Sequence, residues 1–228
     1  MENVSKFAVL STMAMTISTF EQFSENSMKE SYTSSEKERI VDVKTRAQGI
    51  VLNVNYSQVK SVKVKLMNTD LPDVVYYELD GAVLQQILQE VYKDVPLAVN
   101  QNQYVIIPFS VNGFFDLDDD QYIQVTVQLK DNVNLKWDKI VDYNPASNPL
   151  TIKKFVGNEF DSSKYDLAMF LSSDEIRDVR LNFNGQGVNL PQALFHNEFA
   201  VKAYSALKLI PDTNYFLSSE AEVFLVDF

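Results

Sequence analysis

Residue types that could perform nucleophilic, acid–base or metal chemistry are few in this chain. His196 is the single histidine, and no cysteine is present among the 228 residues. A Ser-His-Asp triad would need His196, yet no Gly-x-Ser-x-Gly turn and no glycine-rich phosphate loop accompany it. Zinc sites draw on several histidines and cysteines, which are too few here. The sequence therefore predicts a structural or surface role for His196 and no enzymatic activity.

Three aspartates have a spacing that suits a hard metal ion. Asp116, Asp118 and Asp120 stand at positions one, three and five of a calcium-loop pattern, from which carboxylate oxygens can converge on one ion. Position six is Gln121 instead of glycine, and position twelve is Val127 instead of glutamate, so the segment departs from the EF-hand pattern. Two interpretations stay open, a solvated turn and a weakly held structural calcium ion, and no other cofactor is expected.

The charge and composition of the chain exclude several classes of protein. The formal net charge is −11, from 31 acidic and 20 basic residues. Proteins that bind nucleic acid neutralise phosphates with clustered Lys and Arg, so direct sequence-specific binding to nucleic acid is not expected. The chain is 46% hydrophobic and 12% aromatic, which is typical of a globular protein. No run of 18 apolar residues predicts a membrane span, and the apolar stretch 7–17 is not expected to be a cleaved signal peptide.

Short segments of alternating apolar and polar residues must position the candidate residues named above. Such segments recur along the chain. Residues 59–66 alternate apolar and polar side chains with a basic residue second and fifth, and residues 176–183 do the same. Ile107-Pro108 is matched by Ile210-Pro211, and each is followed by a polar loop and a last alternating strand. Many short strands separated by turn residues predict an all-β chain of sandwich or barrel units.

Three segments are expected. Residues 1–38 begin with a helical rhythm and continue into a Ser-, Glu- and Lys-rich connector, which predicts an N-terminal helical arm. Residues 39–136 form a first β unit that includes a helix over 81–92. Residues 137–228 form a second unit with a shorter helical turn, and the linker is expected in the Pro-, Ser- and Asn-rich stretch 138–150. The arm either lies on the body of the fold or docks on a neighbouring subunit.

In order and type, these elements resemble the double jelly-roll coat proteins of tailless icosahedral bacteriophages. The resemblance rests on the strand 59–66, on the helical segment 79–87 that follows a strand, and on Ile107-Pro108-Phe109 with the acidic loop and the strand 122–129 behind it. It implies two tandem jelly-roll barrels with a short helix in each. It also implies a homotrimer whose six barrels form a pseudo-hexameric capsomer of an icosahedral shell.

The expected function is that of a structural viral coat protein, with the major capsid protein as first choice. The alternatives are a vertex or minor capsid subunit of the same fold and a glycan-binding jelly-roll module. The expected partners are copies of the chain itself and other capsid proteins, with the N-terminal arm reaching an inner membrane or a minor protein. The protein would be made in the host cytoplasm and reside in the virion. Interface residues are expected in the arm and in an aromatic loop: Phe7, Leu10, Ile17, Phe20, Phe114 and Phe115.

The aromatic loop leaves two alternatives open. Phe114 and Phe115 either plug the end of the first barrel or anchor a subunit interface, where aromatic side chains concentrate. Tyr76-Tyr77 is ambiguous in the same way. In a glycan-binding module, Phe114, Tyr143 or Tyr215 would stack on sugar rings.

Overall fold

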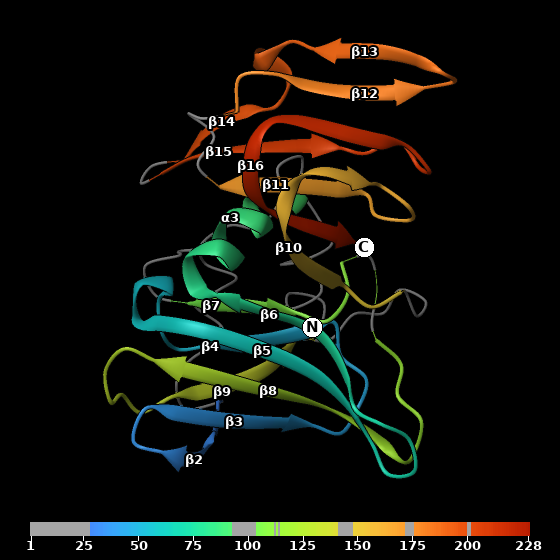
Figure 1. The fold of residues 1–228 in the computed structure, drawn as a ribbon. Helices are drawn as coiled ribbons and strands as arrows, with labels where there is room; N and C mark the ends of the chain where they lie inside the picture. The colour runs from blue at the N-terminus through green and yellow to red at the C-terminus, as the bar shows by residue number, and fades with distance from the viewer. Residues whose placement is uncertain are drawn as a thin grey trace. The chain divides into compact units, whose positions relative to one another are not determined.

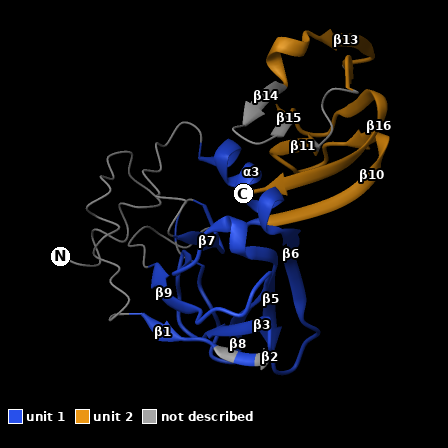
Figure 2. Cartoon of the chain, turned by 90° about the vertical axis from the view of Figure 1, so that its left-hand side faces the viewer, with its two compact units in different colours: residues 1–150 blue, residues 151–228 orange. Residues whose placement is uncertain are grey.

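Strands make up most of the chain that the computed structural model describes, which confirms the all-β prediction. The described residues are 28–92, 104–111, 113, 115–140, 148–171, 176–199 and 202–228. They contain one α-helix, α3 (Gly81–Val91), and the short 3-10 turns η2 (Tyr56–Gln58) and η4 (Gln192–Leu194). None of the described helices has both the length and the apolar character needed to cross a bilayer. Contacts divide the chain into two units, residues 1–150 and residues 151–228 (Figure 2).

The first unit contains two antiparallel sheets (Figure 1). Its strands are β1 (Lys29–Glu30), β2 (Tyr32–Ser35), β3 (Glu38–Val43), β4 (Gly49–Leu52), β5 (Val59–Asn68), β6 (Val74–Asp80), β7 (Val105–Pro108), β8 (Gln121–Leu129) and β9 (Lys136–Ile140). One sheet has the order β1-β9-β4-β7 and the other β2-β3-β8-β5-β6. With β2 set aside and the remaining strands numbered along the chain, the orders are 1-8-3-6 and 2-7-4-5. These are the strand orders of a jelly roll.

Side-chain alternation decides which face of the β2-β3-β8-β5-β6 sheet is buried. Along β8, Ile123, Val125 and Val127 are buried, whereas the residues between them are half-buried on the other face. Strand β5 alternates in step, and Val64 lies opposite Val125 in the register. The predicted strands over 59–66 and 122–129 are therefore confirmed, because a period of two places one set of side chains in the core.

Helix α3 confirms the predicted helix over 81–92 and begins at a close contact. A Cβ atom on Gly81 would lie 2.5 Å from the carbonyl oxygen of Val59 at the start of β5. Only glycine lets the helix begin this near the strand. The apolar face of the helix then buries Leu84, Ile87 and Leu88.

The second unit is built from one seven-stranded antiparallel sheet. Its strands are β10 (Thr151–Asp161), β11 (Leu167–Leu171), β12 (Val179–Phe183), β13 (Gln186–Leu190), β14 (His196–Phe199), β15 (Lys202–Lys208) and β16 (Asn214–Asp227). The order is β13-β12-β16-β11-β15-β14, and β10 also pairs with β16. Residues 214–217 of β16 pair with β12, whereas residues 223–226 pair with β11. Strand β16 therefore belongs to both halves of the sheet.

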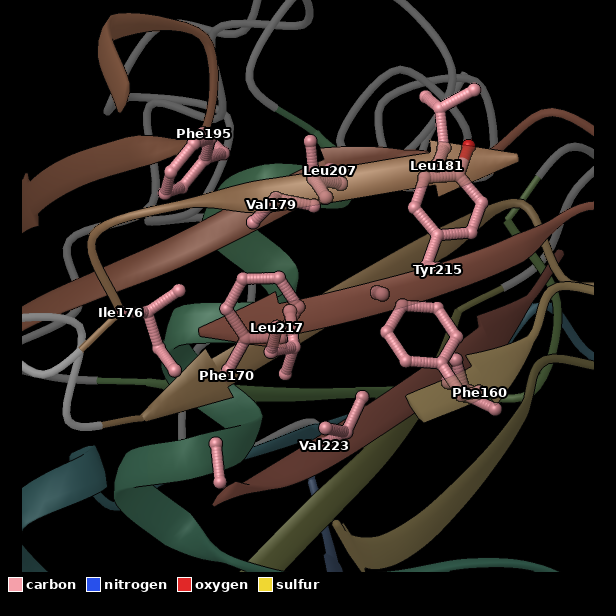
Figure 3. Packing of buried hydrophobic residues seen from close by; sticks show 13 residues of the cluster. Phe160, Phe170, Ile176, Val179, Leu181, Phe195, Leu207, Tyr215, Leu217 and Val223 are labelled. Carbon is pink, nitrogen blue, oxygen red and sulfur yellow. The ribbon is translucent and has the colours of Figure 1, made fainter. Parts of the chain in front are cut away.

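A register shift marks the corner between these two halves. Gly157 of β10 lies opposite Ala221, but Glu159 lies opposite Phe216. In the pairing of β10 with β16, residues 217–220 of β16 thus lie opposite the single residue 158 of β10. Such a bulge bends a strand. The sheet encloses its own core, shown in Figure 3, where the rings of Phe160 and Tyr215 stack at 5.3 Å between centroids.

Two expected segment boundaries shift in the structure. Strand β9 pairs with β4 and β1, so residues 137–140 complete the first unit instead of opening the second. Strands β1 and β2 pair with β9 and β3, so residues 29–35 belong to the sheets of the first unit instead of to an arm. Both boundaries shift because pairing with strands that are distant in the sequence determines the unit to which each segment belongs. The units divide at Leu150, the end of the expected linker, and the predicted helix within residues 1–27 lies outside the described residues.

Candidate functional surfaces

Side chains able to hold a metal ion do not gather in the part of the chain that the structure describes. No group of three His, Asp or Glu side chains there is close enough to bind an ion. His196 lies on β14 in register with Ser205 of β15, and its side chain is outside the described part.

The acidic loop before β8 is a hydrogen-bonded turn. Asp116, Asp118 and Asp120 are all exposed. The backbone N–H of Asp118 donates to Oε1 of Gln121 at 3.1 Å, and the N–H of Gln121 donates to the carbonyl of Asp118 at 3.0 Å. Oδ1 of Asp116 accepts from the N–H of Leu117. This geometry shows how the loop holds its shape, and calcium binding there stays a prediction.

Phe115 lies in the core of the first unit. Its N–H donates to the carbonyl of Ala47 at 2.8 Å, and its ring meets that of Tyr76 edge-on at 5.6 Å. This burial favours the barrel-plugging alternative over an interface anchor for Phe115. The other expected interface residues lie outside the described residues: Phe7, Leu10, Ile17, Phe20 and Phe114.

A bulge in β6 explains why Tyr76 and Tyr77 are both buried. Val64 of β5 pairs with Tyr77, but the next residue, Lys65, pairs with Val75. Tyr76 is the extra residue, so two consecutive side chains turn to the same face. The Tyr77 hydroxyl donates to the carbonyl of Pro108 at 2.7 Å. The tyrosine pair is therefore structural.

Three buried hydroxyls occupy the core of the first unit. Burial raises the pKa of Tyr56, Tyr77 and Tyr92, and the pKa of Tyr77 and of Tyr92 is raised further by charge repulsion from the neighbouring tyrosines. The Tyr92 hydroxyl has no hydrogen-bond partner among the described residues. These groups stay neutral at physiological pH, so they do not provide a general base.

Tyr215 is not available to bind a sugar. It is 1% exposed, stacks on Phe160, and its hydroxyl accepts a hydrogen bond from the N–H of Ile210 at 2.9 Å. The prediction that it stacks on a sugar ring is wrong, because the alternation of β16 directs it into the core. The other two candidates, Phe114 and Tyr143, lie outside the described residues.

An exposed apolar patch lies at the β5–β6 hairpin. Leu71, Val74 and Val75 are 67%, 45% and 50% exposed. We call these three residues the hairpin patch. Strand β6 is an edge strand of its sheet, and apolar side chains on an open edge favour association. The hairpin patch is thus the candidate contact surface of the first unit.

Comparisons with known proteins give weak similarity to solved structures. No family model and no curated protein sequence matches the chain. Among solved structures, the chain is similar to one titled "Crystal Structure of the STIV MCP", with a TM-score of 0.47 and 10% sequence identity. The alignment covers 87% of this chain and 93% of that chain. This similarity is too weak to carry a conclusion, so the function proposed below rests on strand order.

Proposed function

We propose that this chain is a structural subunit of a viral shell, built from two jelly rolls in tandem. The observation that carries the proposal is that the strand order of the first unit recurs in the second. The first unit has the orders 1-8-3-6 and 2-7-4-5.

The second unit gives the same orders once its two long strands are divided at the register shift. Strand β10 then provides segments 151–157 and 159–161, and β16 provides segments 214–217 and 221–227. With β14 set aside, segments 151–157 and 221–227 lie beside β11 and β15 in the order 1-8-3-6. Segments 159–161 and 214–217 lie beside β12 and β13 in the order 2-7-4-5. This supports a second jelly roll in which two corners are crossed by continuous strands.

Duplicated shape suits assembly better than catalysis. A jelly roll packs its strands into two sheets and leaves short edges, which protects a protein held at high local concentration from edge-to-edge aggregation. Identical subunits joined by heterologous contacts form closed rings when the rotation closes. If each chain has two jelly rolls, a ring of three chains contains six jelly rolls. The hairpin patch is a candidate contact between chains in this ring.

Native mass measurement tests the proposal. Sedimentation velocity of the purified full chain, in moderate salt with calcium, should show a species three times the 26.0 kDa of one chain. Chemical crosslinking should stop at the trimer before larger assemblies appear. A monomer at every protein concentration, with no crosslinked trimer, would contradict the shell proposal.

A paired substitution tests the hairpin patch. Leu71→Asp together with Val75→Lys should weaken the trimer at least tenfold, because charges replace apolar side chains that are 67% and 50% exposed in the chain alone. The thermal midpoint of the monomeric fold should change little. Ile210→Asp is the matched control, since Ile210 is an exposed apolar residue of the second unit. A vertex or minor subunit would share this fold, and copy number in a purified particle distinguishes it from the major one.

A further inference from the structure

One hollow in the second unit is lined by residues that shell assembly does not explain. Its lining residues belong to the β12–β13 hairpin and to β16, and its volume is about 350 Å³. These elements are labelled in Figure 1. Ligand sites commonly have volumes of roughly 300–1,000 Å³ and a few fixed polar groups. The lining residues are Arg180, Asn182, Gly185, Gly187 and Phe216.

Strand alternation places these side chains on the outer face of the sheet. Val179 and Leu181 point into the core, as Figure 3 shows, so Arg180 between them points away from it. Arg180 pairs in register with Phe216 of β16. Register partners on one face lie side by side, so a guanidinium group and a half-buried aromatic ring form adjacent walls of the hollow.

Two glycines keep the hollow open. A Cβ atom on Gly187 would lie 2.6 Å from Nη2 and 2.7 Å from Nε of Arg180, so the guanidinium lies directly over this glycine. Gly185 has a φ of +78° in the hairpin turn, and a Cβ atom there would meet nothing within 4 Å. The side chain of Arg180 thus rests on the backbone of β13, beside space that no other side chain fills.

Among the residues that the structure describes, the guanidinium of Arg180 has no partner. It makes no ion pair and no hydrogen bond with any of the described residues, although the chain has 31 acidic side chains. Glu159 of β10 pairs with Phe216 from the side opposite to Arg180. The aromatic ring therefore separates Arg180 from that carboxylate. An arginine fork binds a carboxylate through two parallel hydrogen bonds.

We propose that this hollow binds a sugar acid, such as a hexuronate residue of an acidic glycan. The carboxylate pairs with Arg180, the C–H face of the sugar ring packs on Phe216, and a ring hydroxyl bonds to the amide of Asn182. A neutral sugar would leave the guanidinium unpaired. A bare carboxylate would leave the aromatic wall and most of the volume unfilled.

Ligand-detected NMR on the full chain tests this assignment. The probes are glucuronate, galacturonate, glucose, acetate and a short poly-glutamate peptide, each titrated at the same ionic strength. We expect at least one of the two hexuronates to bind with a millimolar Kd, and glucose and acetate to bind at least tenfold more weakly.

Three variants locate the binding. Arg180→Gln removes the fork, and Gly187→Ala displaces the guanidinium, which is the movable end of a side chain, without requiring an unusual backbone conformation. Both should weaken hexuronate binding at least tenfold. Arg177→Gln removes the same charge from an exposed position of the same unit outside the hollow and should leave binding unchanged.

Each other outcome overturns the assignment. No hexuronate binding, or binding that survives both Arg180→Gln and Gly187→Ala, excludes the hollow as a sugar-acid site. Tighter binding of poly-glutamate or acetate that depends on Arg180 identifies a site for acidic peptides or simple carboxylates instead. The thermal midpoint of each variant confirms that the second unit is folded, and its native mass shows whether assembly is unaffected.

Discussion

The outward faces of two sheets, one in each unit, differ in how they use their charged side chains. In the first unit, the outer face of β3-β8-β5-β6 pairs charges and amides across neighbouring strands. Ion pairs and one amide–carboxylate hydrogen bond, each at 3.2 Å, join Lys63 to Glu78, Lys65 to Asp73 and Gln124 to Asp42. In the second unit, the outer face of β12-β13 and β16 carries Arg180, which has no partner among the described residues.

The comparison shows that antiparallel sheets with one buried face can differ in the chemistry of the other face. A jelly roll requires only that one face of each sheet be apolar, and the other face is free to vary. Where neighbouring strands carry complementary residues, the face is saturated and inert. Where a strand that contains a glycine lies beside an arginine and an aromatic residue, the outer face of an antiparallel sheet offers a binding surface.

The largest expected effect contrasts Arg180 with the buried Arg39. Arg39 is 6% exposed and joins the β2–β3 turn to the β8–β9 loop. It donates to the carbonyls of Ser35, Glu36, Glu38 and Val133 and to Oδ1 of Asn132. Arg39→Ala should destabilise the first unit by about 3 kcal/mol, because it removes a buried guanidinium whose partly buried hydrogen bonds join the two loops.

Urea unfolding of each variant measures this difference. Arg180→Ala is the control and should change stability by no more than about 0.5 kcal/mol, since an exposed, unpaired side chain contributes little to the fold. Equal losses for the two variants would show that Arg180 has a structural role and would weaken its assignment as a ligand contact.

Two glycines give the next largest contrast. Gly81→Ala brings a Cβ atom to 2.5 Å from the carbonyl oxygen of Val59, and backbone on both sides must move. A loss of about 2 kcal/mol is expected, which is typical of overpacking. In Gly187→Ala, the obstructing group is the flexible end of Arg180, so the thermal midpoint should hardly change. A large loss for Gly187→Ala would mean that the arginine is fixed by the fold.

Alkaline pH should destabilise the core of the first unit. The tyrosines of the first unit have pKa values above the ordinary 10.0, so their neutral forms stabilise the fold fully below pH 10. As pH rises above 10, the unfolded chain ionises first and stability is lost. For Tyr92 alone, the loss should be about 1.4 kcal/mol per pH unit.

Comparison of the wild type with Tyr92→Phe checks this expectation. The variant should be at least as stable as the wild type at pH 8, because the Tyr92 hydroxyl has no described hydrogen-bond partner. Its urea midpoint should then fall less steeply between pH 10 and pH 11. Parallel slopes for the two proteins would show that Tyr92 ionises in the folded state.

The smallest effect concerns the paired face of the first unit. Lys63 and Glu78 form an ion pair at 3.2 Å with side chains 36% and 61% exposed. A double-mutant cycle to alanine should give a coupling of about 0.5 kcal/mol that falls with added salt. A coupling near zero would mean that side-chain pairing constrains the outer face of the first unit no more than it constrains that of the second unit.

Much of the fold could be predicted from the sequence because local periodicity reports local structure. The alternation of 59–66 and 122–129 predicted buried strands, and the change of period after Asp80 predicted the helix. The bulge at Tyr76 could not be predicted, since it depends on the register with β5. The segment 29–35 has no strong alternation, and only its partners make it part of the sheets.

The hollow at Arg180 was missed, although one signal for it is present. Asn184-Gly185 is a typical two-residue hairpin turn, and both residues have positive φ angles of 50° and 78°. Reading that turn would have paired 179–183 with 186–190 and placed Gly187 opposite Asn182. The position of Phe216 beside Arg180 would still have been hidden, because β13, β14 and β15 separate β12 from β16 in the sequence.

The sequence by itself determined that the described part of the chain is all-β, which segments alternate, where helix α3 lies and that the net charge is strongly negative. These properties depend on residue type and short-range spacing. Tertiary structure alone decided which strands are neighbours, where β10 and β16 cross a corner without a break, and which arginine is buried and which is left unpaired. Those outcomes depend on register between distant segments, because a shift of one residue moves every side chain to the opposite face.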